Sequence, residues 1–161
     1  MRFLIRQKYF SIRDGFYITD EAGRNAYFVQ GKIFTLGKQL TMYDLSGREI
    51  LFIKQRIFRI LPTFDVYQNN EVVAKIKRIL PLIFVKRYKV KSSLFGDLKI
   101  KGNVFAWNFA IVDAQGKEVG RVSKKVLRVR DTYAVDVYDK QLEPMVLALT
   151  IILDAVHHRH H

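Results

Sequence analysis

The feature that most constrains the fold is an apolar segment, QLEPMVLALTIILDAV, at 141–156. Pro144 suits the first turn of a helix, and Glu143 lies where a carboxylate stabilises the positive end of the helix dipole. Within 145–153 every residue except Thr150 is apolar, so the predicted helix has no polar stripe and must be enclosed on all sides. A bilayer-spanning helix needs about 20 apolar residues, and this run is roughly half as long. The sequence therefore predicts a helix enclosed by the protein's own sheet.

The side chains of this helix are the expected centre of the core. We expect burial of Met145, Val146, Leu147, Leu149, Ile151, Ile152 and Leu153. Asp154 follows them, and a fully buried carboxylate needs a partner or a raised pKa. We therefore expect Asp154 to mark the point where the helix emerges at the rim of the sheet.

The rest of the chain alternates apolar and polar residues with period two, which is typical of half-buried strands. The clearest segments are 40–44, 50–56, 72–77, 88–91, 98–101 and 133–138. In the last of these, Tyr133, Val135 and Val137 share one face, while Asp136 and Tyr138 share the other. Such segments predict strands with one face toward a core and one toward solvent.

Turn signals separate these strands. Asp20, Asp44 and Asp113 each begin a D-x-x-G-[RK] motif, in which the Asp side chain accepts backbone amide hydrogen bonds and the glycine supplies a positive φ. Asn69-Asn70 forms a further turn, so four hairpins are predicted. An open sheet of roughly ten to twelve strands would leave edges that need cover. We therefore predict a mainly β fold, a closed antiparallel β-barrel that encloses the C-terminal helix.

Charge narrows the classes of partner. Lys and Arg number 28 against 15 Asp and Glu, which gives a net charge of +13. Such a surface favours nucleic acid, an anionic membrane surface or an acidic protein. Lysines also serve on solvent faces of strands, where they discourage edge-to-edge pairing, so charge alone leaves these interpretations open. Arg6 and Lys8 interrupt the apolar start, which argues against a signal peptide, and we expect a cytoplasmic protein.

Catalytic residue types are scarce in the body of the chain. No cysteine occurs, and all four histidines lie within 157–161, a polar tail after one domain spanning 1–156. The turn aspartates have a structural role, and Asp131, Asp136 and Asp139 are expected at solvated positions. A glycosidase-type carboxylate pair stays open, because spatial separation is not visible in a sequence. No P-loop, G-x-G-x-x-G or G-x-S-x-G motif occurs, so we expect a non-enzymatic domain without a metal or cofactor.

One constellation fits a membrane-docking loop, an apolar run at 79–84 with cations on both sides. The candidate headgroup ligands are Lys75, Lys77, Arg78, Lys86, Arg87 and Lys89, and the candidate membrane-contact residues are Leu80, Leu82, Ile83 and Phe84. Each cation near an anionic surface is worth about 1 kcal/mol. The alternative is a strand, a proline and a second strand, with the apolar residues in the core. A similar order of cations, aliphatic residues and proline recurs at 54–62, which favours that alternative.

Four stretches carry a resemblance to a known family. They are FLIRQKYF at 3–10, D-x-x-G-[RK]-E at 44–49 and 113–118, and VLALTIILDAVHH at 146–158. They resemble the tubby C-terminal-like superfamily, and within it the LURP-one-related, YxjI-like branch, which also includes relatives of the phospholipid scramblases. The resemblance implies a barrel of about 12 strands around a hydrophobic C-terminal helix. Tubby proteins bind phosphoinositides, but no ligand contact transfers to a residue of this chain.

Charge, the bracketed apolar run and the resemblance together favour one function. We expect a binding domain for anionic phospholipids or phosphoinositides, peripheral at the membrane. Nucleic-acid binding is the alternative polyanion function, and it would need exposed aromatic residues among the cations, as at Tyr88 between Arg87 and Lys89. A protein-interaction scaffold is the third interpretation. The sequence does not indicate an oligomeric state.

Overall fold

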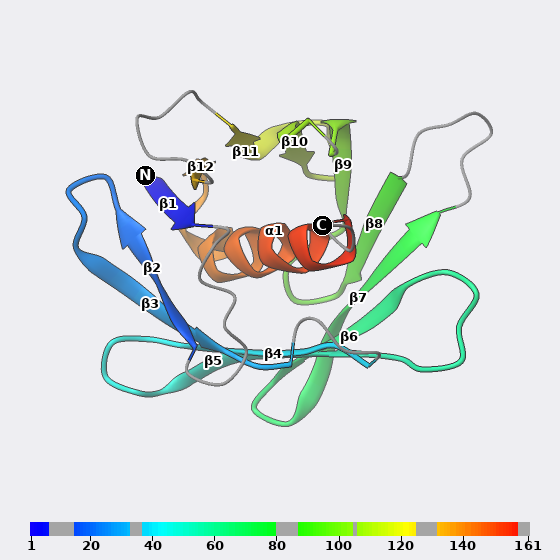
Figure 1. Cartoon of the computed structure of the whole chain (residues 1–161). Helices are drawn as coiled ribbons and strands as arrows, with labels where there is room; N and C mark the ends of the chain where they lie inside the picture. The colour runs from blue at the N-terminus through cyan, green and yellow to red at the C-terminus, as the bar shows by residue number, and fades with distance from the viewer. Residues whose placement is uncertain (7–14, 33–36, 80–86, 105, 125–131, 158–161) are drawn as a thin grey trace.

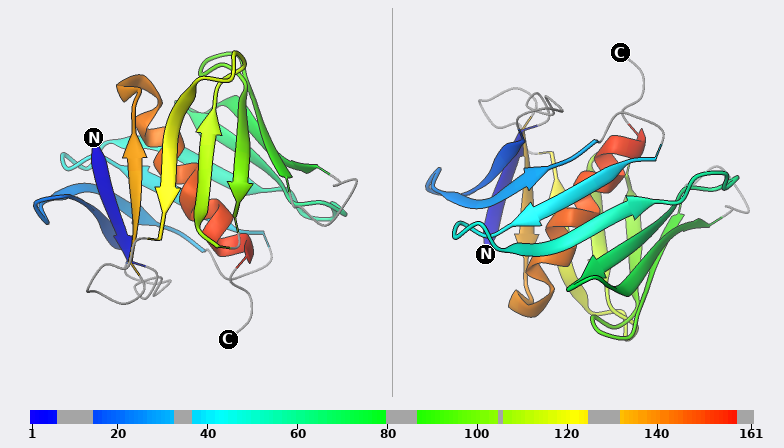
Figure 2. Two further views of the ribbon diagram at one scale, coloured as in Figure 1. Left: turned by 90° about the horizontal axis from the view of Figure 1, so that it is seen from above. Right: turned by 90° about the horizontal axis from the view of Figure 1, so that it is seen from below.

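The computed structural model describes residues 1–6, 15–32, 37–79, 87–104, 106–124 and 132–157, with only the backbone of Arg87. Within these residues twelve strands close into one antiparallel barrel, and a single α-helix runs through its centre (Figures 1 and 2). The predicted fold class is therefore confirmed. No helix in the described part of the chain reaches the length and apolarity that spanning a bilayer requires.

The strands follow one another around the barrel in chain order, each antiparallel to its neighbours. They are β1 (Arg2–Arg6), β2 (Phe16–Asp20), β3 (Asn25–Gln30), β4 (Gln39–Tyr43), β5 (Glu49–Gln55), β6 (Thr63–Gln68), β7 (Glu71–Ile79), β8 (Arg87–Ser92), β9 (Leu98–Asn103), β10 (Asn108–Val112), β11 (Glu118–Ser123) and β12 (Thr132–Val137). A 3-10 turn, η2 (Lys140–Leu142), then leads into helix α1 (Glu143–His157).

The predicted turn chemistry is confirmed. In each D-x-x-G-[RK] turn the Asp Oδ1 accepts amide hydrogen bonds from the residues two and four positions later, at 2.8–3.0 Å. Gly23, Gly47 and Gly116 have φ values of 79°, 85° and 83°. Asn69 and Asn70 have φ values of 51° and 64°, the two positive angles of a type I′ turn. All four predicted hairpins form.

The barrel closes between β1 and β12, which are far apart in the sequence. The Arg2 guanidinium donates to both carboxylate oxygens of Asp136, at 2.7 and 3.1 Å. The Met1 ammonium donates to the Val137 carbonyl oxygen at 2.7 Å. A bidentate arginine–carboxylate pair fixes geometry as well as adding energy. Asp136 therefore serves the closure of the sheet, and the expectation of a solvated position is wrong, since its side chain is only 17% exposed.

Helix α1 fills the barrel, as the absence of a polar stripe predicts. All seven predicted core side chains of the helix are 0% exposed. Gly120 on β11 allows a close approach, because a Cβ there would lie 2.8 Å from Cγ1 of Val146. At the start of the helix the Tyr27 hydroxyl on β3 donates to the buried Glu143 carboxylate. The helix is thus fitted to the wall by both shape and hydrogen bonding.

The helix stays inside the barrel for longer than the sequence suggested. Asp154 is 2% exposed, so the expectation that it marks the emergence of the helix at the rim is wrong. Burial, together with the nearby Asp154 carboxylate, raises the pKa of Tyr133. His157, placed in the predicted tail, is the last helical residue, and its ring packs edge-on against Tyr88 with centroids 5.6 Å apart. The remainder of the tail, 158–161, lies outside the described residues.

Candidate functional site

The outer face of β7, β8 and β9 carries lysines that lie directly opposite one another. In the sheet register Lys77 pairs with Lys89, and Lys89 pairs with Lys99. All three side chains are exposed, because the residues on either side of them in the strands point into the barrel. We call these three residues the lysine row. Like charges directly opposite each other destabilise a sheet, so the lysine row is not explained by stability.

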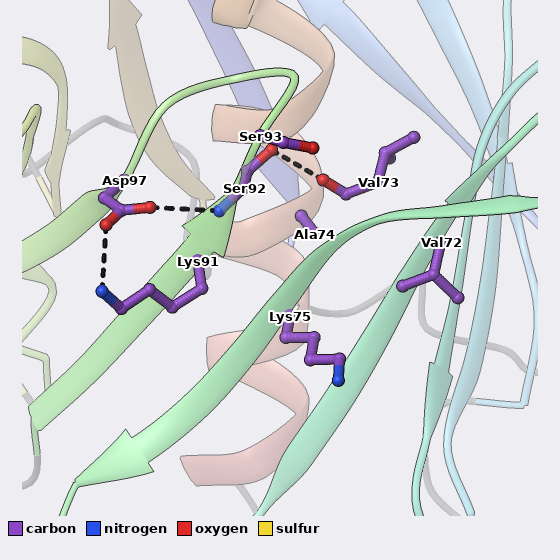
Figure 3. A pocket seen from close by; sticks show the side chains of 8 residues that line it. All are labelled: Val72, Val73, Ala74, Lys75, Lys91, Ser92, Ser93 and Asp97. Carbon is purple, nitrogen blue, oxygen red and sulfur yellow. Dashed lines mark hydrogen bonds and ion pairs between the residues drawn. The ribbon is translucent and has the colours of Figure 1, made fainter.

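The next row of outward side chains shows how the same sheet neutralises charge elsewhere. Asp65 pairs in register with Lys75, which in turn pairs with Lys91. The Lys91 ammonium lies 3.0 Å from an Asp97 carboxylate oxygen, and the Asp65 carboxylate accepts two hydrogen bonds from Arg56 at 2.6 and 3.0 Å. Figure 3 shows Lys91 turned toward Asp97 and Lys75 pointing the other way. Carboxylates therefore flank this second row on both sides.

Within the described residues, by contrast, no ion pair involves any member of the lysine row. Lys99 acts on one carboxylate only at longer range. The pKa of Asp97 is lowered first by the hydrogen bond from Lys91 and also by the charge of Lys99. The lysine row is thus an exposed positive surface whose ammonium groups have no ion-pair partner among the described residues.

Arg78 lies apart from these lysines, although it follows Lys77 directly. Its register partner is Tyr88, which is 1% exposed, and the Arg78 Nε is buried. The guanidinium is close enough to Tyr88 to oppose the rise in pKa that burial causes there. Of the predicted headgroup ligands, the structure therefore brings Lys75, Lys77 and Lys89 to one face and directs Arg78 toward the interior.

The predicted membrane-contact residues and one predicted cation cannot be placed. Leu80, Leu82, Ile83, Phe84 and Lys86 lie outside the described residues. Arg87 begins β8, and only its backbone is described. These residues stay predictions.

Sequence reasoning did not single out Lys99, the third member of the lysine row. The alternation Leu98-Lys99-Ile100-Lys101 indicates that Lys99 points outward. That alternation gives no pairing register, and register decides which lysine of the neighbouring strand lies opposite.

Several carboxylates among the described residues have a structural role. Asp20, Asp44 and Asp113 organise turns, and Asp139 accepts the Gln141 amide at the start of η2. No group of three or more His, Asp or Glu side chains in the described ranges could hold a metal ion. The geometry that stands out from this background is the lysine row, which can bind anions electrostatically.

Comparisons with known proteins identify the family. The family profile described as LURP-one-related matches residues 1–154. The chain belongs to the LURP-one-related family. It is 28% identical over 152 residues to the protein YxjI of Bacillus subtilis (strain 168), covering 94% of this chain and 91% of that one. The predicted family resemblance is therefore confirmed, and the architecture is consistent with the wider tubby-like superfamily.

A solved structure agrees with this family on the fold. An X-ray structure of a protein from Arabidopsis thaliana matches with a TM-score of 0.67 and 17% sequence identity, covering 96% of this chain and 90% of that one. At this identity the likeness concerns the fold alone. Neither the family description nor the names of these relatives states a ligand or an activity.

Proposed function

We propose that this domain of the LURP-one-related family binds anionic phospholipid headgroups at a membrane surface, without catalytic turnover. The observation that carries the proposal is the lysine row, Lys77, Lys89 and Lys99, opposite one another in register on an exposed face. Neighbouring phosphates of a membrane surface can meet several of these ammonium groups at once, and each cation is worth about 1 kcal/mol near such a surface. The net charge of +13 adds long-range attraction.

The absence of turnover rests on the residues available at this face. An ammonium group has no lone pair to act as a base or nucleophile, and no histidine or cysteine of the described residues lies on β7, β8 or β9. Asp97, a carboxylate at this face, is held by Lys91 and the Ser92 amide. These residues favour binding without turnover at this face.

The test is sedimentation with vesicles of neutral phosphatidylcholine, alone or with phosphatidylserine or a phosphoinositide at equal surface charge. A nucleic-acid shift assay at matched salt and phosphate concentration runs beside it, because salt dependence alone does not separate the two polyanions. We expect binding to both anionic vesicles, and a preference between them identifies the headgroup. Equal and poor sedimentation with neutral and anionic vesicles, or tighter binding to nucleic acid, would refute the proposal.

Matched variants locate the binding face. Lys77→Gln with Lys89→Gln removes two charges from the lysine row, worth about 2 kcal/mol or about thirtyfold in binding. Lys117→Gln with Lys140→Gln removes the same charge from exposed positions after β10 and β12. The control pair should weaken binding far less. An equal loss in both pairs would show that net charge acts without a defined site.

A further inference from the structure

The loop between β5 and β6, residues 56–62, is firmly anchored at its base. The Arg56 amide donates to the Thr63 carbonyl oxygen at 2.9 Å, and the Arg56 guanidinium makes its two hydrogen bonds to Asp65. The Arg78 amide on β7 donates to the Pro62 carbonyl oxygen at 3.0 Å. The loop therefore leaves the barrel in a fixed direction, and it extends at the right-hand edge of Figure 1.

Three large apolar side chains are exposed at the tip of this loop. Phe58 is 98% exposed, Ile60 is 100% exposed and Ile57 is 49% exposed. Leu45 and Leu94 are also exposed, but each occurs singly in a turn, which is ordinary for a protein surface. Three such side chains within four residues form a local apolar surface that the fold itself does not use.

The backbone at this tip is unfavourable for the residue it holds. Phe58 has a φ of 61°, a region that glycine and asparagine adopt readily and bulky residues rarely do. An asparagine or glycine at this position would relieve the strain and remove an exposed aromatic ring. Local strain that stability does not explain points to a role for the side chain.

The loop ends beside the lysine row. Thr63, the first residue after the loop, pairs in register with Lys77. Arg59, exposed in the loop itself, adds a cation between Phe58 and Ile60. An apolar tip bordered by cations is the arrangement that suits the interface of an anionic bilayer, where aliphatic and aromatic groups enter the acyl boundary and cations stay among the phosphates.

We propose that Ile57, Phe58 and Ile60 insert into the bilayer and orient the barrel so that the lysine row contacts the headgroups. This inference rests on the proposed function. It adds which residues enter the bilayer and how the barrel is oriented on it. The occupant is a phospholipid bilayer, since nucleic acid would offer bases to stack on aromatic rings but no apolar phase for the two isoleucines. A protein partner is a separate outcome of the test.

The direct experiment places a fluorescent reporter at the tip with Phe58→Trp. The chain has one tryptophan, Trp107, which is 2% exposed inside the barrel and serves as a constant background. Anionic vesicles that contain brominated acyl chains should quench the added tryptophan. Binding of this variant to vesicles without such quenching overturns the insertion, while failure of the parent protein to bind any anionic vesicle overturns the proposed function instead.

A pair of variants supplies the second measurement. Phe58→Asn with Ile60→Asn should weaken binding to anionic vesicles about tenfold for each side chain removed and leave the salt dependence of binding unchanged. Leu45→Asn with Leu94→Asn removes apolar surface from turns elsewhere and should bind like the parent. A cooperative urea-unfolding transition with a parent-like midpoint checks that the tip variant is folded. Parent-like vesicle binding by the tip variant, or a tip-dependent self-association without vesicles, would refute the inference.

Discussion

The interior of the barrel and the outer face of β7, β8 and β9 follow opposite rules. Inside, side chains are 0% exposed along most of the helix, and a glycine lies where a larger residue would collide with the helix. Outside, three lysines oppose one another, and the adjoining loop exposes a phenylalanine at a positive φ. Sequences depart from folding rules mainly where function requires it. The outer face of β7, β8 and β9, with its adjoining loop, is therefore the region whose residues are not explained by stability.

The largest expected effect comes from placing a charge in the interior. Leu149→Asp puts a carboxylate at a position that is 0% exposed in the centre of the helix. An unpaired buried charge costs several kcal/mol, which approaches the entire stability of a domain of this size. We expect no cooperative unfolding transition by circular dichroism. A folded, cooperatively melting variant would show that the interior tolerates charge.

A smaller effect is expected at the hydrogen bond between wall and helix. Tyr27→Phe removes the hydroxyl that donates to Glu143, whose residue is 9% exposed. Leaving a buried carboxylate without this donor should lower the free energy of unfolding by about 1–3 kcal/mol. Tyr43→Phe, at a half-buried position on β4, is the control and should change it by less than about 0.5 kcal/mol. Equal urea midpoints for the two variants would contradict the assigned role.

On the outer face, a new carboxylate should raise the free energy of unfolding instead of lowering it. Lys89→Glu replaces the middle of the lysine row and lies between Lys77 and Lys99, so two like-charge pairs become opposite-charge pairs. The free energy of unfolding should rise by about 0.5–1 kcal/mol while binding to anionic vesicles falls. Lys54→Glu is the matched control, because Lys54 lies opposite Asp65 and its reversal should lower stability. A stability loss at Lys89→Glu would remove the contrast between the two regions.

The smallest effect concerns acid stability at a turn. The pKa of Asp44 is lowered, first by the Ser46 hydroxyl and then by backbone amides and Arg48. A carboxylate with a lowered pKa in the folded state contributes stability above its unfolded pKa of 3.8, and this is lost as pH falls through the folded value. Asp44→Asn keeps the acceptor oxygen of the turn, so its urea midpoint should fall less between pH 6 and pH 3. An equal fall in urea midpoint between pH 6 and pH 3 for parent and variant would contradict this.

Local chemistry made most of the fold predictable from the sequence. The D-x-x-G-[RK] turns and the stripe-free helix each depend on residues close together in the chain, and both were predicted correctly. The Arg2–Asp136 pair was missed because it depends on which strands meet when the sheet closes. The burial of Asp154 was missed for a related reason: the depth of the barrel around the helix is not encoded in the helix.

The candidate site was predictable in composition and not in geometry. The cations of β7 and β8 were identified from their clustering, but the separation of Arg78 from Lys77 follows from strand alternation, which places neighbours on opposite faces. The lysine row itself depends on register across three strands. The recurrence of cations, aliphatic residues and proline at 54–62 did not indicate an exposed apolar tip at Phe58 and Ile60. Exposure depends on the course of the loop, which its sequence does not give.

The pairing of β1 with β12 also bears on how the protein is made. During synthesis the intervening strands can form successive hairpins, yet both edges of that growing sheet stay open and its inner face has no helix to cover it. The barrel can close and fill only after β12 and α1 have left the ribosome, and pairings between such distant segments form slowly. The nascent chain, rather than the finished barrel, is therefore the state most prone to aggregation. Outward lysines on that open sheet would keep one unfinished chain from pairing with another.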